Sequence, residues 1–469
     1  MDKFKWLFYL LLCTYFSSCS EAEQAASRAT KPNLIVIMTD DQGWADVGFN
    51  GCQDIPTPYI DRIAKEGVRF AEAYVTFPVC GPSRAGFLTG RYQDRFGFTT
   101  NPSIDPTNST AGLPIQEETI AQVLKKADYK SAIIGKWHMG THPLFHPLER
   151  GFDYFFGFLS GGHNYYPQDL YLDDITQVTQ NWEWYRTKLI ENRQTINIHN
   201  YLTDELSDAA VRFIKKQSDA GQHFMLYLAY NAPHTPLQAT EKYLARFDDM
   251  QDEKRKTYAA MVSAVDDGVG RVLQTLTEQG IDEHTLIVFL SDNGGARNNA
   301  SQNTPLRGFK SELFEGGIRV PFAMRWKNVI PPGQNYNKPI SSLDIMATIV
   351  AQNEIPIVQE RPLDGVDLIP FLTGKNDGNP HDYLFWRKWE QGAMAVRKGH
   401  LKLVSNGDQK GESPFLFDVV SDVGENMQLS GDNQQVLDDL MSNWKDWNAQ
   451  LKERVFPTLG ADVWWTEDQ

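Results

Sequence analysis

Four apolar runs in this sequence each end in residues that could carry out chemistry. The runs and the groups that follow them are Asn33–Met38 before Thr39-Asp40-Asp41, Lys130–Gly135 before Lys136-Trp137-His138, His223–Tyr230 before Asn231–His234, and Thr285–Leu290 before Ser291-Asp292-Asn293. Short, continuously apolar runs are typical of strands that are buried on both faces of a parallel sheet. Because the carboxyl ends of parallel strands line one crevice, we expect the four polar groups to converge in space.

Two of these groups together predict a metal site. Asp40, Asp41, Asp292 and Asn293 supply three carboxylates and one amide, and the set needs neither Cys nor His. Hard oxygen ligands of this kind favour Ca²⁺ or Mg²⁺ over zinc. Three carboxylates packed together without a cation would repel one another or take up protons. We therefore expect one divalent ion at this position, with Ca²⁺ preferred.

Cys80 is expected beside this carboxylate cluster, at the start of a short helix. Pro82 suits the first helical turn, and Gly90 suits the end of the helix. Backbone N–H groups and the helix dipole stabilise an anion at such a position, so on general grounds the thiol would be an activated nucleophile. Two plainer interpretations remain open, namely a small buried cysteine and a disulfide with Cys52, which otherwise reads as a buried thiol.

The motifs around these residues resemble those of a known family. The matching segments are Asp40-Asp41-Gln42-Gly43, Cys80-Gly81-Pro82-Ser83-Arg84 with Leu88-Thr89-Gly90-Arg91, Gly135–Gly140 (GKWHMG), Ala232-Pro233-His234, Ser291-Asp292-Asn293-Gly294, and Gly308-Phe309-Lys310 with Glu315–Pro321. In this order they resemble the formylglycine-dependent type I sulfatases of the alkaline phosphatase superfamily, over roughly residues 32–420. The family uses C-x-P-S-R to direct oxidation of the cysteine to formylglycine (3-oxoalanine). The resemblance therefore implies a maturation enzyme as a partner.

The resemblance also implies roles for individual residues. Asp40, Asp41, Asp292 and Asn293 would bind Ca²⁺ together with the formylglycine made from Cys80.

Four further groups would act on the substrate and on the hydrated aldehyde. Arg84 would hold and polarise the aldehyde hydrate, and Lys136 and Lys310 would neutralise the sulfate oxygens, where charge develops during transfer. His234 would protonate the departing alcohol. His138 would then take a proton from the second hydroxyl of the hydrate, which expels sulfate and restores the aldehyde.

The order of expected elements predicts an α/β fold. Strands alternate with helices at Thr57–Gly67, Ile115–Asp128 and Glu253–Gly280, which favours a large, mostly parallel or mixed sheet flanked by helices. We expect this alkaline-phosphatase-like catalytic domain over residues 32–374. Residues 375–469 are expected to form a smaller α+β domain of antiparallel strands and one helix. Gly161–Asn200 is rich in aromatic residues and has weak periodicity, so a loop-rich insertion is expected there.

The start of the chain resembles a bacterial lipoprotein signal. Two lysines precede the apolar run Trp6–Phe16, which is too short to span a bilayer, and small residues stand directly before Cys19. We expect a signal peptide at residues 1–18, lipidation of Cys19, and a polar tether at residues 19–31. The protein would then sit in a bacterial cell envelope and touch the membrane only through its lipid anchor. An ordinary cleaved signal peptide is the alternative.

Charge and composition narrow the class of substrate. The chain has 469 residues, with 45 Lys and Arg against 60 Asp and Glu, and no basic run interrupts its net charge of −15. Nucleic acid is therefore not expected as a partner, because its binding needs a basic surface. Anion specificity must come from a few buried cations.

The resemblance points to sulfated polysaccharides or oligosaccharides, from algae (ulvan, carrageenan) or from a host. His163, Asn164 and Arg387 are the candidate sugar contacts. Sugar rings could also stack on aromatic residues of the insertion and of the start of the C-terminal domain, namely Tyr165, Tyr166, Trp182, Trp184, Tyr185, Trp386 and Trp389, although such residues are more often part of a core. Two other functions stay open. One is a phosphodiester or phosphonate hydrolase of the same superfamily, and the other is a non-catalytic, glycan-binding lipoprotein.

Overall fold

The computed structural model describes residues 31–358, 360–388, 392–407, 414–429 and 433–457. The expected signal peptide, the lipidated Cys19, all but the last residue of the tether and Trp389 lie outside these ranges. Within them, no helix has both the length and the apolar character that crossing a bilayer requires.

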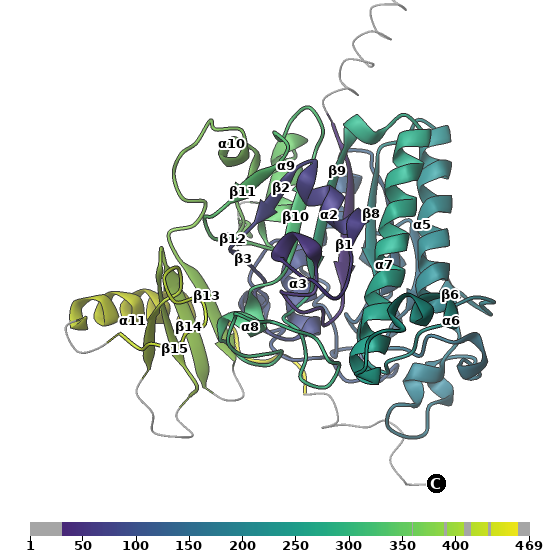
Figure 1. The fold of residues 1–469 in the computed structure, drawn as a ribbon, viewed down its shortest axis with the longest axis horizontal. Helices are drawn as coiled ribbons and strands as arrows, with labels where there is room; N and C mark the ends of the chain where they lie inside the picture. The colour runs from purple at the N-terminus through teal and green to yellow at the C-terminus, as the bar shows by residue number, and fades with distance from the viewer. Residues whose placement is uncertain (1–30, 359, 389–391, 408–413, 430–432, 458–469) are drawn as a thin grey trace, which may run out of the picture.

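A mixed sheet of ten strands forms the centre of the molecule (Figure 1), in the order β11-β2-β10-β9-β1-β8-β4-β5-β6-β7. The strands are β1 (Asn33–Thr39), β2 (Val68–Phe70), β4 (Lys130–Lys136), β5 (Tyr154–Phe158), β6 (Leu189–Glu191), β7 (Gln194–Ile196), β8 (Phe224–Ala229), β9 (Thr285–Ser291), β10 (Phe322–Arg325) and β11 (Gln334–Tyr336). The four predicted strands are β1, β4, β8 and β9, and they pair in parallel at the centre. The fold class predicted from the sequence is confirmed.

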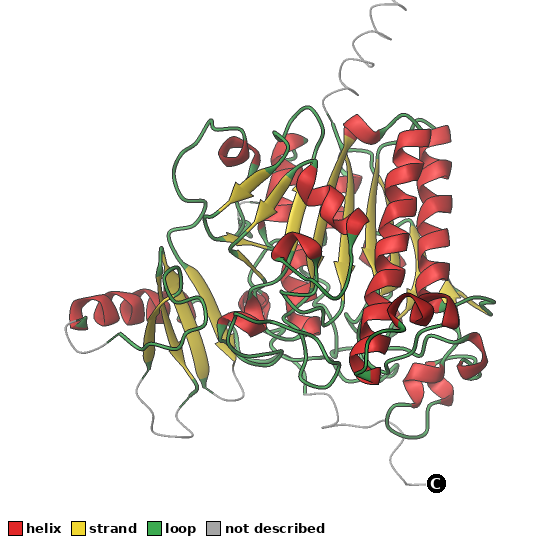
Figure 2. Ribbon diagram, in the orientation of Figure 1, coloured by secondary structure: helices red, strands yellow, loops and turns green. Residues whose placement is uncertain are grey.

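Helices cover both faces of the sheet (Figure 2). They are α2 (Pro58–Lys65), α3 (Cys80–Thr89), α4 (Ile120–Lys125), α5 (Leu202–Asp219), α6 (Glu241–Leu244), α7 (Glu253–Glu278), α8 (Glu315–Ile318), α9 (Asp344–Gln352) and α10 (Ile369–Leu372). Of these, α2, α5 and α7 share one hydrophobic core, and α3, α4 and α9 share another on the opposite face.

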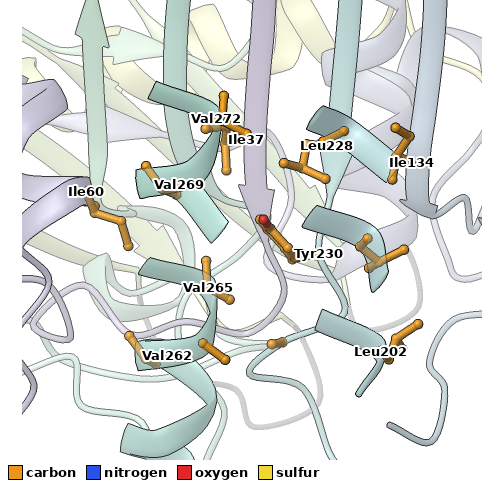
Figure 3. Close-up of a cluster of buried hydrophobic side chains, with 14 of the residues drawn as sticks. Ile37, Ile60, Ile134, Leu202, Leu228, Tyr230, Val262, Val265, Val269 and Val272 are labelled. Atoms are coloured by element: carbon orange, nitrogen blue, oxygen red, sulfur yellow. The ribbon is translucent and has the colours of Figure 1, made fainter. Parts of the chain in front are cut away.

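Alternation along β1 shows how one strand serves both cores. Ile35 and Ile37 belong to the core under α7, whereas Leu34 and Val36 belong to the other. Helix α7 presents a stripe of valines to the sheet, and Figure 3 labels Val262, Val265, Val269 and Val272, which belong to the same core as Ile37 and Leu228. This spacing keeps one side of the helix apolar, so the sheet is held rigid beneath the ends of its strands.

A second, antiparallel sheet lies beside the first (Figure 1) and carries one helix. Its elements are β13 (Leu384–Lys388), β14 (Ala393–Lys398), β15 (Leu401–Ser405), β16 (Phe415–Asp418) and α11 (Gln434–Asn448), and a short pair, β3 (Ala73–Tyr74) with β12 (Ile340–Ser341), completes the strands. Buried ion pairs link this sheet to the catalytic domain, including Arg397 with Glu72, between β2 and β3, and Lys402 with Glu315 of α8. The predicted domain boundary at residues 374 and 375 falls between α10 and β13.

Two local predictions need correction. The helix expected at Ile115–Asp128 begins only at Ile120, because Thr119 caps it and forms a capping box with Gln122. The insertion at 161–200 consists mostly of loops and short 3-10 turns, as expected, but β6 and β7 add two antiparallel strands to the edge of the large sheet.

Candidate active site

The polar groups at the ends of β1, β4, β8 and β9 meet in space. The backbone N–H of Asp41 donates to Asp292 Oδ1 at 3.2 Å. Lys136 Nζ lies 2.6 Å from Asp40 Oδ2, and His234 Nε2 lies 3.6 Å from Asp41 Oδ2. Residues far apart in the sequence thus form one site at the carboxyl edge of the sheet, which in Figure 1 is the lower edge of β1 and β8.

Three carboxylates and three cations alternate in this site. Arg84 binds Asp292 at 2.8 Å, and Lys310 Nζ lies 2.7 Å from Asp41 Oδ1. Burial is the main cause that raises the pKa of Asp40 to about 7, and the negative charge of Asp292 acts in the same direction. Burial opposes ionisation of Asp41 as well, but Lys310 keeps its pKa below the usual range. The pKa values of Asp40 and Asp41 therefore differ, because cations compensate the negative charge of Asp41 more fully.

The carboxylate cluster fits a divalent cation. Asp40 Oδ1 and Asn293 Oδ1 are buried and have no hydrogen-bond partner among the described residues. Donor atoms of Asp40, Cys80 and Asp292 all lie within 4.8 Å of one another. Buried oxygens without partners cost free energy, and a hard cation would satisfy them and lower the pKa of Asp40.

Cys80 is the first residue of α3 and is buried. Its Sγ lies 3.8 Å from Asn101 Oδ1, which also accepts from the Gly81 backbone N–H at 2.9 Å. Burial raises the pKa of the thiol, although Lys136 and Lys310 act in the other direction. Desolvation of the unmodified thiol therefore opposes the activation that is expected from the helix N-terminus. Both Cys80 and Cys52 are free thiols, so no disulfide joins them.

The two histidines of the site differ in their hydrogen bonds. His234 Nδ1 lies 2.6 Å from the carbonyl oxygen of Thr235, so this nitrogen donates and Nε2 faces Asp41. Burial lowers the pKa of His234 to about 4, with Asp41 opposing the shift. His138 is buried, adopts a positive φ of 59°, and neither of its ring nitrogens has a partner among the described residues. Burial lowers the pKa of His138 well below the usual range, and the positive charges of Lys136 and Arg84 lower it further.

A pocket of about 250 Å³ opens above these groups. Its lining consists of Asp41, Cys80, Asn101, Ile104, His138, Gly161, Trp182, Trp184, Tyr185, His234, Thr235, Asn298 and Lys310. The base is therefore charged, and one side is aromatic. Such a pocket suits an anion that is attached to a group with an apolar face.

Comparisons with known proteins identify the family. A sequence model of the Sulfatase family matches residues 32–354. The chain belongs to the sulfatase family. It is 33% identical to an N-acetylgalactosamine-6-sulfatase of Canis lupus familiaris over 451 residues, which covers 88% of this chain and 84% of that protein. This sulfatase is a sulfuric ester hydrolase, as the sequence resemblance predicted.

Solved structures agree with this assignment. The crystal structure of Ps i-CgsB in complex with k-i-k-neocarrahexaose is 38% identical, with a TM-score of 0.86 and coverage of 91% of this chain and 94% of that one. PsFucS1 sulfatase from Pseudoalteromonas sp. is 28% identical, with a TM-score of 0.78 and coverage of 94% of each chain. The likeness spans both sheets of this sulfatase, because it extends well beyond the region matched by the family model.

The candidate sugar contacts of this sulfatase lie outside the lining of the pocket. His163 is buried, its Nδ1 lies 2.9 Å from the carbonyl oxygen of Asn164, and its ring packs on Phe158. The backbone N–H of Asn164 donates to the carbonyl oxygen of Tyr185 at 2.9 Å. None of the predicted contacts, His163, Asn164 or Arg387, lines the pocket.

Arg387 has a structural position that corrects the prediction of a sugar contact. Its guanidinium binds Asp94 Oδ1 at 3.1 Å, Asn448 Oδ1 at 3.0 Å and the carbonyl oxygen of Lys452 at 2.7 Å. The side chain is buried between the small sheet and the segment around Asp94, so it holds the two parts of the chain together.

Two polar residues of the site, Asn101 and Tyr227, were not predicted from the sequence. Asn101 caps the turn that carries Cys80, and no motif marks it. Tyr227 accepts a hydrogen bond from Arg84 Nη1 at 3.1 Å. A tyrosine inside an apolar strand was the available signal, since a buried hydroxyl usually has a partner.

Proposed function

We propose that this protein hydrolyses sulfate esters of a sulfated oligosaccharide, using an aldehyde made from Cys80 and one calcium ion. The observation that carries the proposal is the alternation of three carboxylates and three cations around Cys80, at the base of the pocket. A divalent ion would add two positive charges to a site whose own charges cancel. The base of the pocket would then attract a sulfate monoester strongly.

Formylglycine would supply the nucleophile, and calcium would supply further positive charge. Formylglycine at position 80, when hydrated, would supply an oxygen nucleophile in place of the protonated thiol. Calcium, held by Asp40, Asp41, Asp292 and Asn293, would supply charge next to the sulfate oxygens.

The chain's own cations would bind and orient the sulfate. Lys310 reaches from the loop before α8 to Asp41, and Lys136 extends from the end of β4 to Asp40. Both ammonium groups lie within reach of an anion beside residue 80, and burial strengthens such contacts in the transition state. Arg84 is fixed by Asp292 and Tyr227, so its charge is preorganised before substrate enters.

Proton transfer falls to the two histidines. His234 has Nε2 toward the pocket because Nδ1 donates to the Thr235 carbonyl. Nε2 carries a proton in the imidazolium form, which the neighbouring Asp41 favours, and that proton could pass to the oxygen of the departing alcohol. His138 has two free ring nitrogens among the described residues and a low pKa, so it would be neutral and could accept a proton near residue 80.

Carrageenan-type oligosaccharides are the substrates that we propose first. The neighbour Ps i-CgsB is described in complex with k-i-k-neocarrahexaose, and its identity of 38% supports a related sulfated galactan here. N-acetylgalactosamine 6-sulfate is the second choice, from the name of the curated relative.

A phosphohydrolase finds less support in the metal site. Among the described residues, the two groups of side chains suited to a metal share Asp40, and only one of them contains a histidine, His234. A second metal site of the kind that many phosphohydrolases use is therefore not supported.

The location and maturation of the protein are part of the proposal. Lipidation of Cys19 would tether the catalytic domain to a bacterial envelope membrane, and a maturation enzyme would oxidise Cys80 before or during export. Both steps rest on the sequence motifs alone.

Sulfate release tests the proposed function. The protein would be produced together with a formylglycine-generating enzyme and incubated with k-i-k-neocarrahexaose, N-acetylgalactosamine 6-sulfate and 4-nitrophenyl sulfate. We expect sulfate, measured by ion chromatography, from the wild type and none from Cys80→Ala. Phosphonate monoester hydrolysis without sulfate release would overturn the proposal.

A further inference from the structure

We propose that Trp182 and Tyr185 form a sugar-binding wall, on which the pyranose ring that carries the sulfate is held. The inference rests on the proposed function and deepens it by naming how the sugar is recognised. We call Trp182, Trp184 and Tyr185 the aromatic wall.

The aromatic wall stands directly beside the reacting groups. The ring centroids of Tyr185 and His234 are 6.4 Å apart, and those of Trp182 and Tyr185 are 5.8 Å apart. All three residues of the wall line the pocket that also contains Cys80 and Lys310. A ring whose oxygen lies at His234 would therefore extend along Tyr185 toward Trp182.

Within the wall, one tryptophan is anchored and the other is presented to solvent. Trp184 is 4% exposed and packs with Ile104 and Val178 in a small separate core. Trp182 is 61% exposed, although its ring lies only 5.4 Å from that of Trp184. The exposed indole stands at the mouth of the charged pocket, so a ligand that enters the pocket could cover its face.

The backbone holds Trp182 in an unusual conformation. Its φ of 72° and ψ of −5° lie in the left-handed region, which a bulky side chain rarely adopts. The turn is held by a hydrogen bond from the Tyr185 N–H to the Trp182 carbonyl, and Glu183 accepts from the Thr179 N–H. These two hydrogen bonds lie within residues 179–185, so the turn sets the backbone position from which the indole projects.

Tyr185 contributes a hydroxyl that the protein leaves available. Among the described residues, no group forms a hydrogen bond with this hydroxyl. A Cβ on Gly162 would lie 2.5 Å from it, and a Cβ on Gly161 would lie 2.6 Å from His138 Nε2. The two glycines therefore leave room for both side chains to approach the pocket.

The chemistry of the pocket matches a sulfated pyranose. The charged base binds the sulfate group, the Tyr185 hydroxyl can bond to a ring substituent, and the indole of Trp182 can cover the C–H face of the sugar. A planar aromatic surface beside a few polar groups is the usual composition of a site for such amphipathic ligands.

Kinetics on variants of the wall test the inference. The wild type and Trp182→Ala, Trp182→Phe and Tyr185→Phe would be assayed on k-i-k-neocarrahexaose and N-acetylgalactosamine 6-sulfate, with inorganic sulfate as a competitive inhibitor. By analogy with stacking of bases on aromatic side chains, we expect Trp182→Ala to lower kcat/KM about tenfold to a hundredfold, mainly through KM. Trp182→Phe should recover most of the loss, and the Ki of sulfate should change less than about twofold.

Tyr171→Ala is the matched control. Tyr171 is an exposed aromatic residue of the same insertion, at 53% exposure, but it does not line the pocket. We expect no change in KM for this variant.

Three outcomes would overturn the inference. An unchanged KM in Trp182→Ala would do so while leaving the proposed function intact. An equal rise in the Ki of sulfate would show that the substitution disturbs the base of the pocket instead. Hydrolysis of 4-nitrophenyl sulfate but of neither sugar would also count against a sugar-binding wall, whereas no sulfate release from any ester would overturn the proposed function itself.

Discussion

Removal of the His234 imidazole should affect natural and activated substrates very differently. Nδ1 of His234 donates to the Thr235 carbonyl, so the proton that His234 can give to a leaving group is the one that Nε2 carries in the imidazolium form. His138 is the other histidine that lines the pocket, and burial and the neighbouring cations lower its pKa, whereas Asp41 opposes the lowering of the pKa of His234 by burial. Of the two histidines that line the pocket, His234 is therefore the one with a carboxylate beside it that favours a transferable proton.

The size of the effect follows from the leaving group. A general acid contributes about 10² to 10⁴ in rate, or about 2.7 to 5.5 kcal/mol, when the departing oxygen is a poor leaving group. A sugar alkoxide needs this proton, but 4-nitrophenolate departs without it. We expect His234→Ala to lower kcat on a sulfated sugar by about a hundredfold or more, and on 4-nitrophenyl sulfate by less than about tenfold.

The assay compares both substrates under one condition. Sulfate release from the sugar and absorbance of 4-nitrophenolate would be measured for the wild type, His234→Ala and the control His199→Ala, whose side chain is exposed. An equal loss of kcat on both substrates would refute the role of His234 as the acid, because the loss would then reflect damage to sulfate binding or to the metal site.

Three further predictions concern the metal and the stability of the fold. Removal of divalent ions by a chelator should abolish activity and Ca²⁺ should restore it, whereas restoration by Zn²⁺ alone would contradict the oxygen-ligand site. Lys402 is fully buried between Glu315 and Glu425, so Lys402→Met should cost about 3 to 5 kcal/mol in denaturant unfolding, and a loss below about 1 kcal/mol would contradict this. Burial opposes the charge on His381, but Asp344 at 2.9 Å raises its pKa above 6.5, so the stabilisation is complete below pH 6.5 and disappears as the pH rises through the folded-state pKa. Melting temperatures of the wild type and His381→Gln across that range should converge at high pH, and a constant difference would argue against the titration.

The central strands were predictable because burial on both faces leaves a plain signal in the sequence. Runs such as Asn33–Met38 contain no polar interruption, and the carboxyl ends of parallel strands must share one edge. The proximity of Asp40 to Asp292 therefore followed from the parallel arrangement of the strands, without knowledge of the residues between them.

Side-chain environments were harder to predict, because they depend on partners distant in the sequence. Arg387 has the chemistry of a sugar contact, but Asp94 and the segment at Lys452 occupy its guanidinium. The motif placed Cys80 at a helix start, but the depth of its burial, which decides the pKa of the thiol, arises from the packing of the whole site.

The mass of the tryptic peptide Phe70–Arg84 tests the central claim most directly. This peptide contains Cys80 and would be taken from protein made in the presence of a maturation enzyme. We expect this peptide to carry an aldehyde in place of the thiol, in the same preparation that releases sulfate. An intact thiol in a preparation that releases sulfate at full rate would contradict it.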